Sequence, residues 1–129
     1  MSEKFTVLIM SSTHWDREWY EPFQGFRYRL VKVTEDAMDK LEQNPEFGAF
    51  TFDGQTIVLE DFLEAAPDQK ERLVKLMQEG RIKVGPWYVM PDAYLPSGES
   101  HIRNLQIGTS IAKSYGVEPM RYGYVCDIF

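Results

Sequence analysis

His14 and Asp16 are the residues of this sequence whose types and spacing most readily suggest chemistry. In an extended segment, side chains at positions i and i+2 leave the same face of the backbone. An imidazole nitrogen and a carboxylate oxygen on one face can share a divalent ion such as zinc. A His–Asp hydrogen bond that holds a loop would have the same spacing. The pair by itself therefore leaves a metal site and a structural contact both open.

A further carboxylate, Asp127, directly follows an apolar segment of the chain. It could complete a metal site or act as a nucleophile, and it could equally cap backbone N–H groups at the start of a loop. Trp15 and Trp19 flank the His14–Asp16 pair. Aromatic faces near carboxylates suit a sugar ring, whereas tryptophan is also a common core residue, so we expect at least one of the two in the core.

The other polar residues near these positions have simpler interpretations. Asp53 precedes a glycine, which is typical of a turn, and His101 at the start of a predicted helix is expected to be exposed or capping. Arg17 and Glu18 either pair locally or point to solvent. Cys126 is expected to be a small buried thiol, because no neighbouring feature marks it as an activated nucleophile.

The segments that must position these residues alternate between strand and helix. Apolar runs predict strands at residues 5–10, 49–52, 81–84 and 121–125, and apolar residues at helical spacing predict helices over 26–41, 57–63, 67–77 and 102–115. The first run is nearly continuous, which is typical of a strand buried on both faces. Such alternation implies a parallel sheet built from crossover units, with functional groups at the carboxyl ends of the strands. The clusters HWDREW, FDGQ, GPWY and CDIF each follow a predicted strand, so we expect one shared site.

Composition narrows the function classes. The 129 residues, 43% of them hydrophobic, fit one ordinary globular domain. Fourteen basic against twenty acidic residues give a net charge of −6, which argues against a nucleic-acid partner. A single cysteine excludes an internal disulfide framework and a multi-thiolate zinc site. No apolar run approaches the ~20 residues of a membrane span, and the first residues do not resemble a signal peptide, so we expect a cytoplasmic protein.

Together these clusters resemble the N-terminal part of the α-mannosidases of glycoside hydrolase family 38. The likeness is strongest to the bacterial branch, which includes mannosylglycerate hydrolase-like enzymes. It covers nearly the whole chain, in order, through the stretches THWDREWY (13–20), FDGQT and VLEDFLE (within 52–64), GPWYVMPD (85–92), SGESHIRNL (97–105) and GYVCDIF (123–129). The resemblance implies an α/β fold in which residues 1–129 form a single partial domain, the N-terminal fragment of a seven-stranded β/α barrel with parallel strands and crossover helices.

The resemblance also implies roles for individual residues. His14 and Asp16 match zinc ligands, and Asp127 matches the residue that is both a zinc ligand and the catalytic nucleophile. Trp19 and Phe129 match aromatic residues that line the mannose site. The implied cofactor is one Zn²⁺, and the implied activity is retaining hydrolysis of terminal α-mannosyl residues from oligosaccharides or mannosyl-glycerate-type glycosides. The expected partner is thus a mannose-containing carbohydrate, with no nucleic acid or membrane, and a homo-oligomer of the full-length enzyme is left open.

Some features of the family pattern are missing from this chain. Ser12 replaces the first His of the usual His-x-His-x-Asp, Cys126 stands where Pro is common, Ile128 stands where a small residue is usual, and Ala93 stands where an acidic residue is frequent. The general acid/base and a fourth zinc ligand, a His, are expected beyond residue 129, so the fragment alone is expected to be inactive. Two alternatives are another metal-dependent carbohydrate hydrolase, such as a deacetylase-type barrel, and a non-catalytic protein that binds a sugar or a partner.

Overall fold

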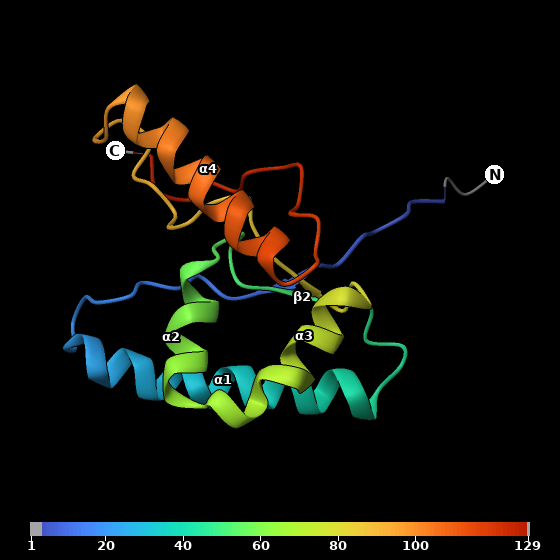
Figure 1. Cartoon of the computed structure of the whole chain (residues 1–129). Helices are drawn as coiled ribbons and strands as arrows, with labels where there is room; N and C mark the ends of the chain where they lie inside the picture. The colour runs from blue at the N-terminus through green and yellow to red at the C-terminus, as the bar shows by residue number, and fades with distance from the viewer. Residues whose placement is uncertain (1–3, 129) are drawn as a thin grey trace.

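The computed structural model describes residues 4–128, which form a small α/β structure around a parallel sheet. Its elements are β1 (Ser11–Ser12), α1 (Phe23–Gln43), β2 (Phe50–Thr51), α2 (Ile57–Ala65), the 3₁₀ turn η1 (Pro67–Gln69), α3 (Lys70–Gln78), β3 (Ile82–Lys83) and α4 (Gly98–Ser114). The strands pair in parallel in the order β1-β2-β3. Helices α1, α2 and α3 lie on one side of the strands, and α4 lies apart from them on the other side (Figure 1). The predicted α/β class with parallel strands is confirmed.

The helices form where the apolar spacing predicts them. The buried residues of α1 recur at helical spacing, and the helix ends before Pro45, whose ring cannot continue it. Helix α3 ends at a glycine, as expected, because Gly80 adopts a φ of 72°. Its N–H donates to the Met77 carbonyl, and the Arg81 N–H donates to the Leu76 carbonyl, which satisfies the last carbonyl groups of the helix.

The hydrophobic core lies between the strands and helices α1, α2 and α3. Leu30, Met38, Phe62, Leu73 and Ile82 are almost fully buried there. Burial of each such side chain contributes about 1.5–3 kcal/mol. This packing holds the carboxyl ends of β2 and β3 in place, which is where the polar loops begin.

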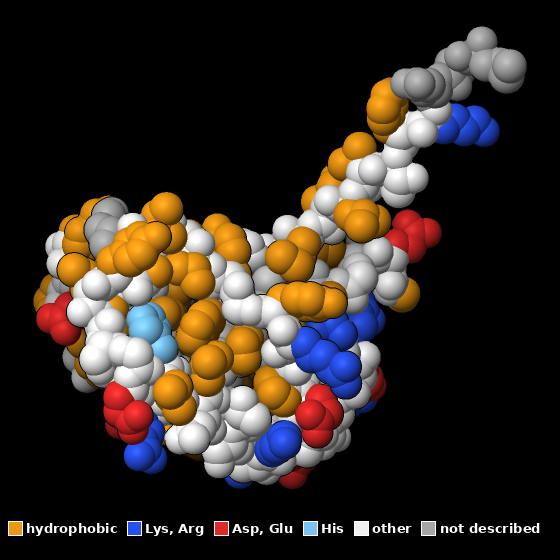
Figure 2. Space-filling model, turned by 90° about the horizontal axis from the view of Figure 1, so that it is seen from above, with side chains coloured by type: hydrophobic (Ala, Val, Ile, Leu, Met, Phe, Trp, Pro, Cys, Tyr) orange, Lys and Arg blue, Asp and Glu red, His pale blue; other side chains and the backbone are white. Residues whose placement is uncertain are grey.

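The strand predicted at residues 5–10 is wrong, because these residues are extended but unpaired. Among the described residues, β1 comprises only Ser11 and Ser12, and the side chains of Leu8 and Ile9 are 92% and 90% exposed. Figure 2 shows the apolar side chains along this arm as it projects from the body of the molecule. An apolar run shows that a segment can be buried in a sheet, but a strand also needs a neighbouring ladder and helices that cover it.

The strand predicted at residues 121–125 is also wrong. The Met120 N–H donates to the Val84 carbonyl, but no ladder follows within the described chain, and Tyr122 is 84% exposed. Instead, side chains and loops hold the segment: the Trp87 indole N–H donates to the Tyr124 carbonyl over 3.0 Å. Without a buried face, the segment gains too little from pairing to form a fourth strand. No helix among residues 4–128 is long and apolar enough to cross a bilayer.

Candidate active site

The loop after β1 sends alternate side chains in opposite directions. His14, Asp16 and Glu18 line a hollow of about 440 Å³, whose other walls are Trp19, Asp92 and Asp127. Trp15, between them, instead packs against the hydrophobic core and meets Phe26 edge to face. The structure therefore places His14, Asp16 and Asp127 at one hollow, as expected from the sequence. It also adds Glu18, which the sequence pattern did not assign to a site.

Arg17 ties this loop to helix α2. Its Nε and Nη2 donate to the two carboxylate oxygens of Asp61 over 2.6 and 2.8 Å, and the Asp61 side chain is only 4% exposed. The guanidinium also lies 4.7 Å from the centre of the Phe23 ring. The hydrogen bond to Asp61 raises the pKa of Arg17 above its ordinary value. Because a two-point contact fixes direction as well as distance, it anchors the loop between Asp16 and Glu18.

Asp53 orients the imidazole ring of His14 through a hydrogen bond. This residue follows β2 with a φ of 55°, and its buried carboxylate lies 2.7 Å from His14 Nδ1 and accepts the Trp15 N–H over 2.9 Å. A proton on Nδ1, donated to Asp53, leaves Nε2 as the free nitrogen. Nε2 lies 3.4 Å from an Asp16 oxygen and 3.5 Å from an Asp127 oxygen. Asp53 is therefore more than the turn residue that the sequence indicated.

The surrounding carboxylates set the charge of the hollow. Burial lowers the pKa of His14, but the hydrogen bond to Asp53 and the negative charges of Asp16, Asp53 and Asp127 outweigh it, so the pKa lies above its ordinary value. Such a negative cluster around one imidazole favours a cation, either a proton on the ring or a metal ion beside it.

Cys126 lies closer to this cluster than the sequence suggested. Its Sγ is 3.2 Å from His14 Nδ1, 3.8 Å from His14 Nε2 and 3.3 Å from the sulfur of Met90. His14, Cys126 and Asp127 each offer one possible ligand atom, and these three atoms lie within 4.8 Å of one another. Burial and the charge of Asp127 raise the pKa of the Cys126 thiol, so it is not an activated nucleophile.

The aromatic residues divide as the sequence suggested. Trp15 belongs to the core, whereas Trp19 is 74% exposed at the rim of the hollow, where it meets Tyr20 edge to face. An exposed indole beside carboxylates is suited to the C–H face of a sugar. Phe129, the other predicted wall, lies outside the described residues.

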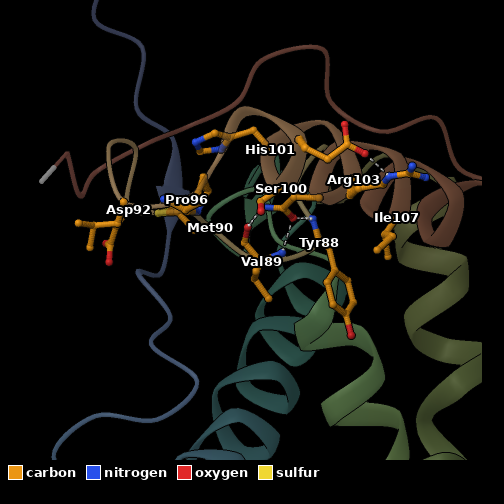
Figure 3. A pocket seen from close by; sticks show the side chains of 13 residues that line it. Tyr88, Val89, Met90, Asp92, Pro96, Ser100, His101, Arg103 and Ile107 are labelled. Carbon is orange, nitrogen blue, oxygen red and sulfur yellow. Dashed lines mark hydrogen bonds and ion pairs between the residues drawn. The ribbon is translucent and has the colours of Figure 1, made fainter.

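A second hollow opens between residues 88–96 and the first turns of α4 (Figure 3). The two hollows are lined by different residues, except that Asp92 borders both. The Asn104 side chain holds the loop by accepting the N–H groups of Tyr88 and Val89 and donating to the Val89 carbonyl. His101 Nε2 lies 3.1 Å from the Ala93 carbonyl, so this histidine contacts the loop instead of the carboxylate cluster.

Comparison with known proteins identifies the family of the chain. Residues 4–129 match the N-terminal domain of the family 38 glycosyl hydrolases. A protein of Halalkalibacterium halodurans that carries the provisional name mannosylglycerate hydrolase is 42% identical over 126 residues, which are 98% of this chain and 14% of that protein.

Two solved structures from Enterococcus faecalis have the same fold. One is an α-mannosidase with a TM-score of 0.82 and 41% identity, matching 86% of this chain and 12% of its own. The other is a family 38 glycosyl hydrolase with a TM-score of 0.79 and 38% identity, matching 88% of this chain and 13% of its own. This chain therefore spans about one seventh of the length of such relatives, and it belongs to glycosyl hydrolase family 38.

Proposed function

We propose that this chain supplies the nucleophile and part of the metal site of a zinc-dependent, retaining α-mannosidase. The observation that carries the proposal is the position of His14 Nε2, 3.4 and 3.5 Å from the carboxylates of Asp16 and Asp127. Membership of family 38 supports hydrolysis of α-mannosides and does not favour the deacetylase or the non-catalytic alternative. The substrate proposed is a terminal α-mannosyl residue of an oligosaccharide or of a mannosyl-glycerate-type glycoside.

The pairs His14–Asp16 and His14–Asp127 each have the separation expected of two ligands on one zinc ion. Ligand atoms about 2.0–2.2 Å from a tetrahedral zinc lie roughly 3.3–3.5 Å apart. The separations of His14 Nε2 from Asp16 and Asp127 match this spacing. Asp53, on the other ring nitrogen, supplies the outer carboxylate that metal-binding histidines commonly have. When bound, zinc would polarise sugar hydroxyl groups and favour the ionised form of Asp127.

The chemistry of the chain's own residues follows from their positions. Asp127 attacks the anomeric carbon, and the bond from that carbon to the leaving oxygen breaks as a second carboxylic acid protonates the oxygen. We propose that this acid lies beyond residue 129, as the resemblance implies. Water then hydrolyses the mannosyl ester on Asp127, which retains the anomeric configuration. Trp19 stacks on the sugar face, and Arg17 holds the loop that carries both Asp16 and Trp19.

The wider fold is part of the proposal. We propose that β1, β2 and β3 are the first strands of a seven-stranded barrel and that residues 1–129 form its N-terminal portion. The edges left by β1 and β3 would then pair with further strands. On this basis the 129-residue chain alone binds zinc but does not turn over substrate.

A chimera tests the activity. In the Halalkalibacterium halodurans relative, the 126 matched residues are replaced by those of this chain, and release of 4-nitrophenol from 4-nitrophenyl α-mannoside is measured with zinc present. We expect hydrolysis, with the α-anomer of mannose formed first in the NMR spectrum. Asp127→Asn should lower the rate by at least about a thousandfold, as loss of a nucleophile does. The matched control Asp36→Asn, an exposed carboxylate on α1, should leave the rate unchanged.

The same chimera can refute the proposal. Formation of the β-anomer first would contradict the retaining mechanism. An Asp127→Asn chimera as fast as the Asp36→Asn chimera would show that Asp127 is not the nucleophile. Turnover by the isolated 129-residue chain at a rate comparable to long homologues would contradict the partial site.

A further inference from the structure

Resting on the proposed function, we infer that Gln55 is a positioning residue, because its side chain connects two loops of the candidate active site. Gln55 follows β2, the middle strand of the sheet, and is only 3% exposed. Its Nε2 donates to the Trp15 carbonyl over 2.9 Å, and its Oε1 accepts the Met90 N–H over 3.1 Å. Trp15 belongs to the loop after β1, and Met90 belongs to the loop after β3. One buried amide group therefore joins the loops on both sides of the middle strand.

The turn after β2 holds the backbone of Trp15 at two points. A backbone hydrogen bond of 2.9 Å closes this turn, so that the side chains of Asp53 and Gln55 both reach Trp15. Asp53 accepts the Trp15 N–H, and Gln55 donates to the Trp15 carbonyl. These two groups belong to the peptide units that join Trp15 to His14 and to Asp16. Their hydrogen bonds therefore fix the backbone that carries both proposed metal ligands.

The Gln55 side chain also holds the loop that contacts Asp127. Two residues after Met90, this loop contains Asp92, which lines the hollow. The next residue, Ala93, donates its N–H to the Asp127 carbonyl over 3.2 Å. A shift of Met90 would thus move a wall of the hollow and the backbone of the proposed nucleophile. Gln55 therefore helps to set the position of Asp127 relative to the loop after β1.

The two contacts of Gln55 require an amide group. An amide offers donors and an acceptor together, whereas an ionised carboxylate only accepts and a thioether is a weak acceptor. Gln55→Glu would place an oxygen against the Trp15 carbonyl, so that two acceptors would repel each other. Gln55→Met keeps a similar side-chain length but leaves the Trp15 carbonyl and the Met90 N–H without this partner. We therefore expect both loops to shift in either variant.

Zinc affinity measures this positioning without any turnover. The purified 129-residue chain is titrated with zinc in competition with a chromophoric chelator. Gln55→Met and Gln55→Glu should each weaken zinc binding by at least about tenfold, as loss of an outer residue of a metal site does. Leu73→Val is the matched control, because Leu73 is fully buried in α3 and does not line the hollow, so the change lowers stability alone. This control should bind zinc as tightly as the wild type.

Two further measurements separate positioning from folding, and circular dichroism checks that each variant is folded. In the chimera saturated with zinc, Gln55→Met should lower kcat at least about tenfold, because small displacements of reacting groups are costly. Leu73→Val should keep the kcat of the unsubstituted chimera. In the 129-residue chain, amide hydrogen exchange followed by NMR should show that Gln55→Met loses protection of the Met90 N–H. The Trp15 N–H should stay protected, because Asp53 still accepts it.

Three outcomes would overturn the positioning role of Gln55. A Gln55→Met variant with the zinc affinity and the kcat of Leu73→Val would show that Gln55 contributes to stability alone. Unchanged protection of the Met90 N–H in Gln55→Met would show that Gln55 does not hold the loop after β3. No zinc binding by the folded wild-type chain would overturn the metal part of the proposed function and this role together. Zinc binding that Gln55→Met leaves unchanged would overturn the role of Gln55 alone, so the two failures are distinguishable.

Discussion

Substitution of Gly108 by alanine is the sharpest test of how α4 is seated. Gly108 faces the loop after β3, and a Cβ at this position would lie 2.3 Å from the Pro86 carbonyl oxygen, 2.4 Å from the Trp87 carbonyl carbon and 2.5 Å from the Tyr88 nitrogen. All three are backbone atoms, so no side chain can rotate away. Ordinary contact begins at 3.4 Å, which means that helix and loop must separate by about 1 Å.

The expected cost follows from these contacts. Inserting a methyl group into a closely packed interface costs about 1–3 kcal/mol. The separation also stretches the three hydrogen bonds of Asn104 to Tyr88 and Val89, each of which contributes about 1 kcal/mol. The higher helix propensity of alanine returns about 1 kcal/mol. We therefore expect Gly108→Ala to lower the free energy of unfolding by about 2–3 kcal/mol.

Urea denaturation followed by far-ultraviolet circular dichroism measures this difference. Gly98→Ala is the matched control, because Gly98 lies in the same helix and a Cβ there meets nothing within 4 Å. This control should be neutral or more stable by up to about 1 kcal/mol. A Gly108→Ala chain at least as stable as the Gly98→Ala chain would refute the close seating of α4 on the loop.

Two further substitutions test the ion pairs. Arg17→Met leaves the buried Asp61 carboxylate without its partner and should cost about 2–3 kcal/mol in urea denaturation, and the double variant Arg17→Met, Asp61→Leu should recover most of it. A double variant no more stable than the single one would contradict this reasoning. The hydrogen bonds from Arg72 lower the pKa of Glu42. The contact therefore stabilises the fold at any pH above the ordinary carboxyl pKa of about 4.3. This stabilisation is lost as the pH falls through the lowered pKa of Glu42. Glu42→Gln should therefore be less stable than wild type at pH 7, by at most about 1 kcal/mol because the pair is exposed. This difference in stability should shrink as the pH falls below 4. A difference that does not change with pH would contradict the role of the ion pair.

Regular patterns in the sequence predicted the helices well. Helices α1, α2, α3 and α4 all appear where apolar spacing placed them, because helical periodicity is a local property. The segments 5–10 and 121–125 were predicted as strands and are not, because a strand depends on partners far along the chain. Apolar composition shows only that a segment could be buried.

The candidate site was predictable in part for the same reason. His14 and Asp16 are two residues apart, and the apolar segment before Asp127, although it forms no strand, suggested that Asp127 would join them. The contacts that hold the site were not predictable from spacing, because Asp53 is 39 residues from His14 and Asp61 is 44 residues from Arg17. Asp53 carried a signal only for a turn, and Asp61 stood in a predicted helix without any feature that pointed to the loop.

At Asp53, the left-handed backbone and the contacts of the side chain favour different residues. A non-glycine residue with a positive φ of 55° is conformationally costly, and glycine would adopt the same backbone freely. Stability alone would therefore favour Asp53→Gly, yet that change would remove the only side chain that contacts both His14 Nδ1 and the Trp15 N–H among the described residues. Asparagine tolerates this backbone and keeps one acceptor oxygen. Asp53→Asn should therefore disturb the orientation of His14 less than Asp53→Gly. A screen for thermostable variants of this chain would thus tend to favour glycine here and to lose the carboxylate contact that orients His14.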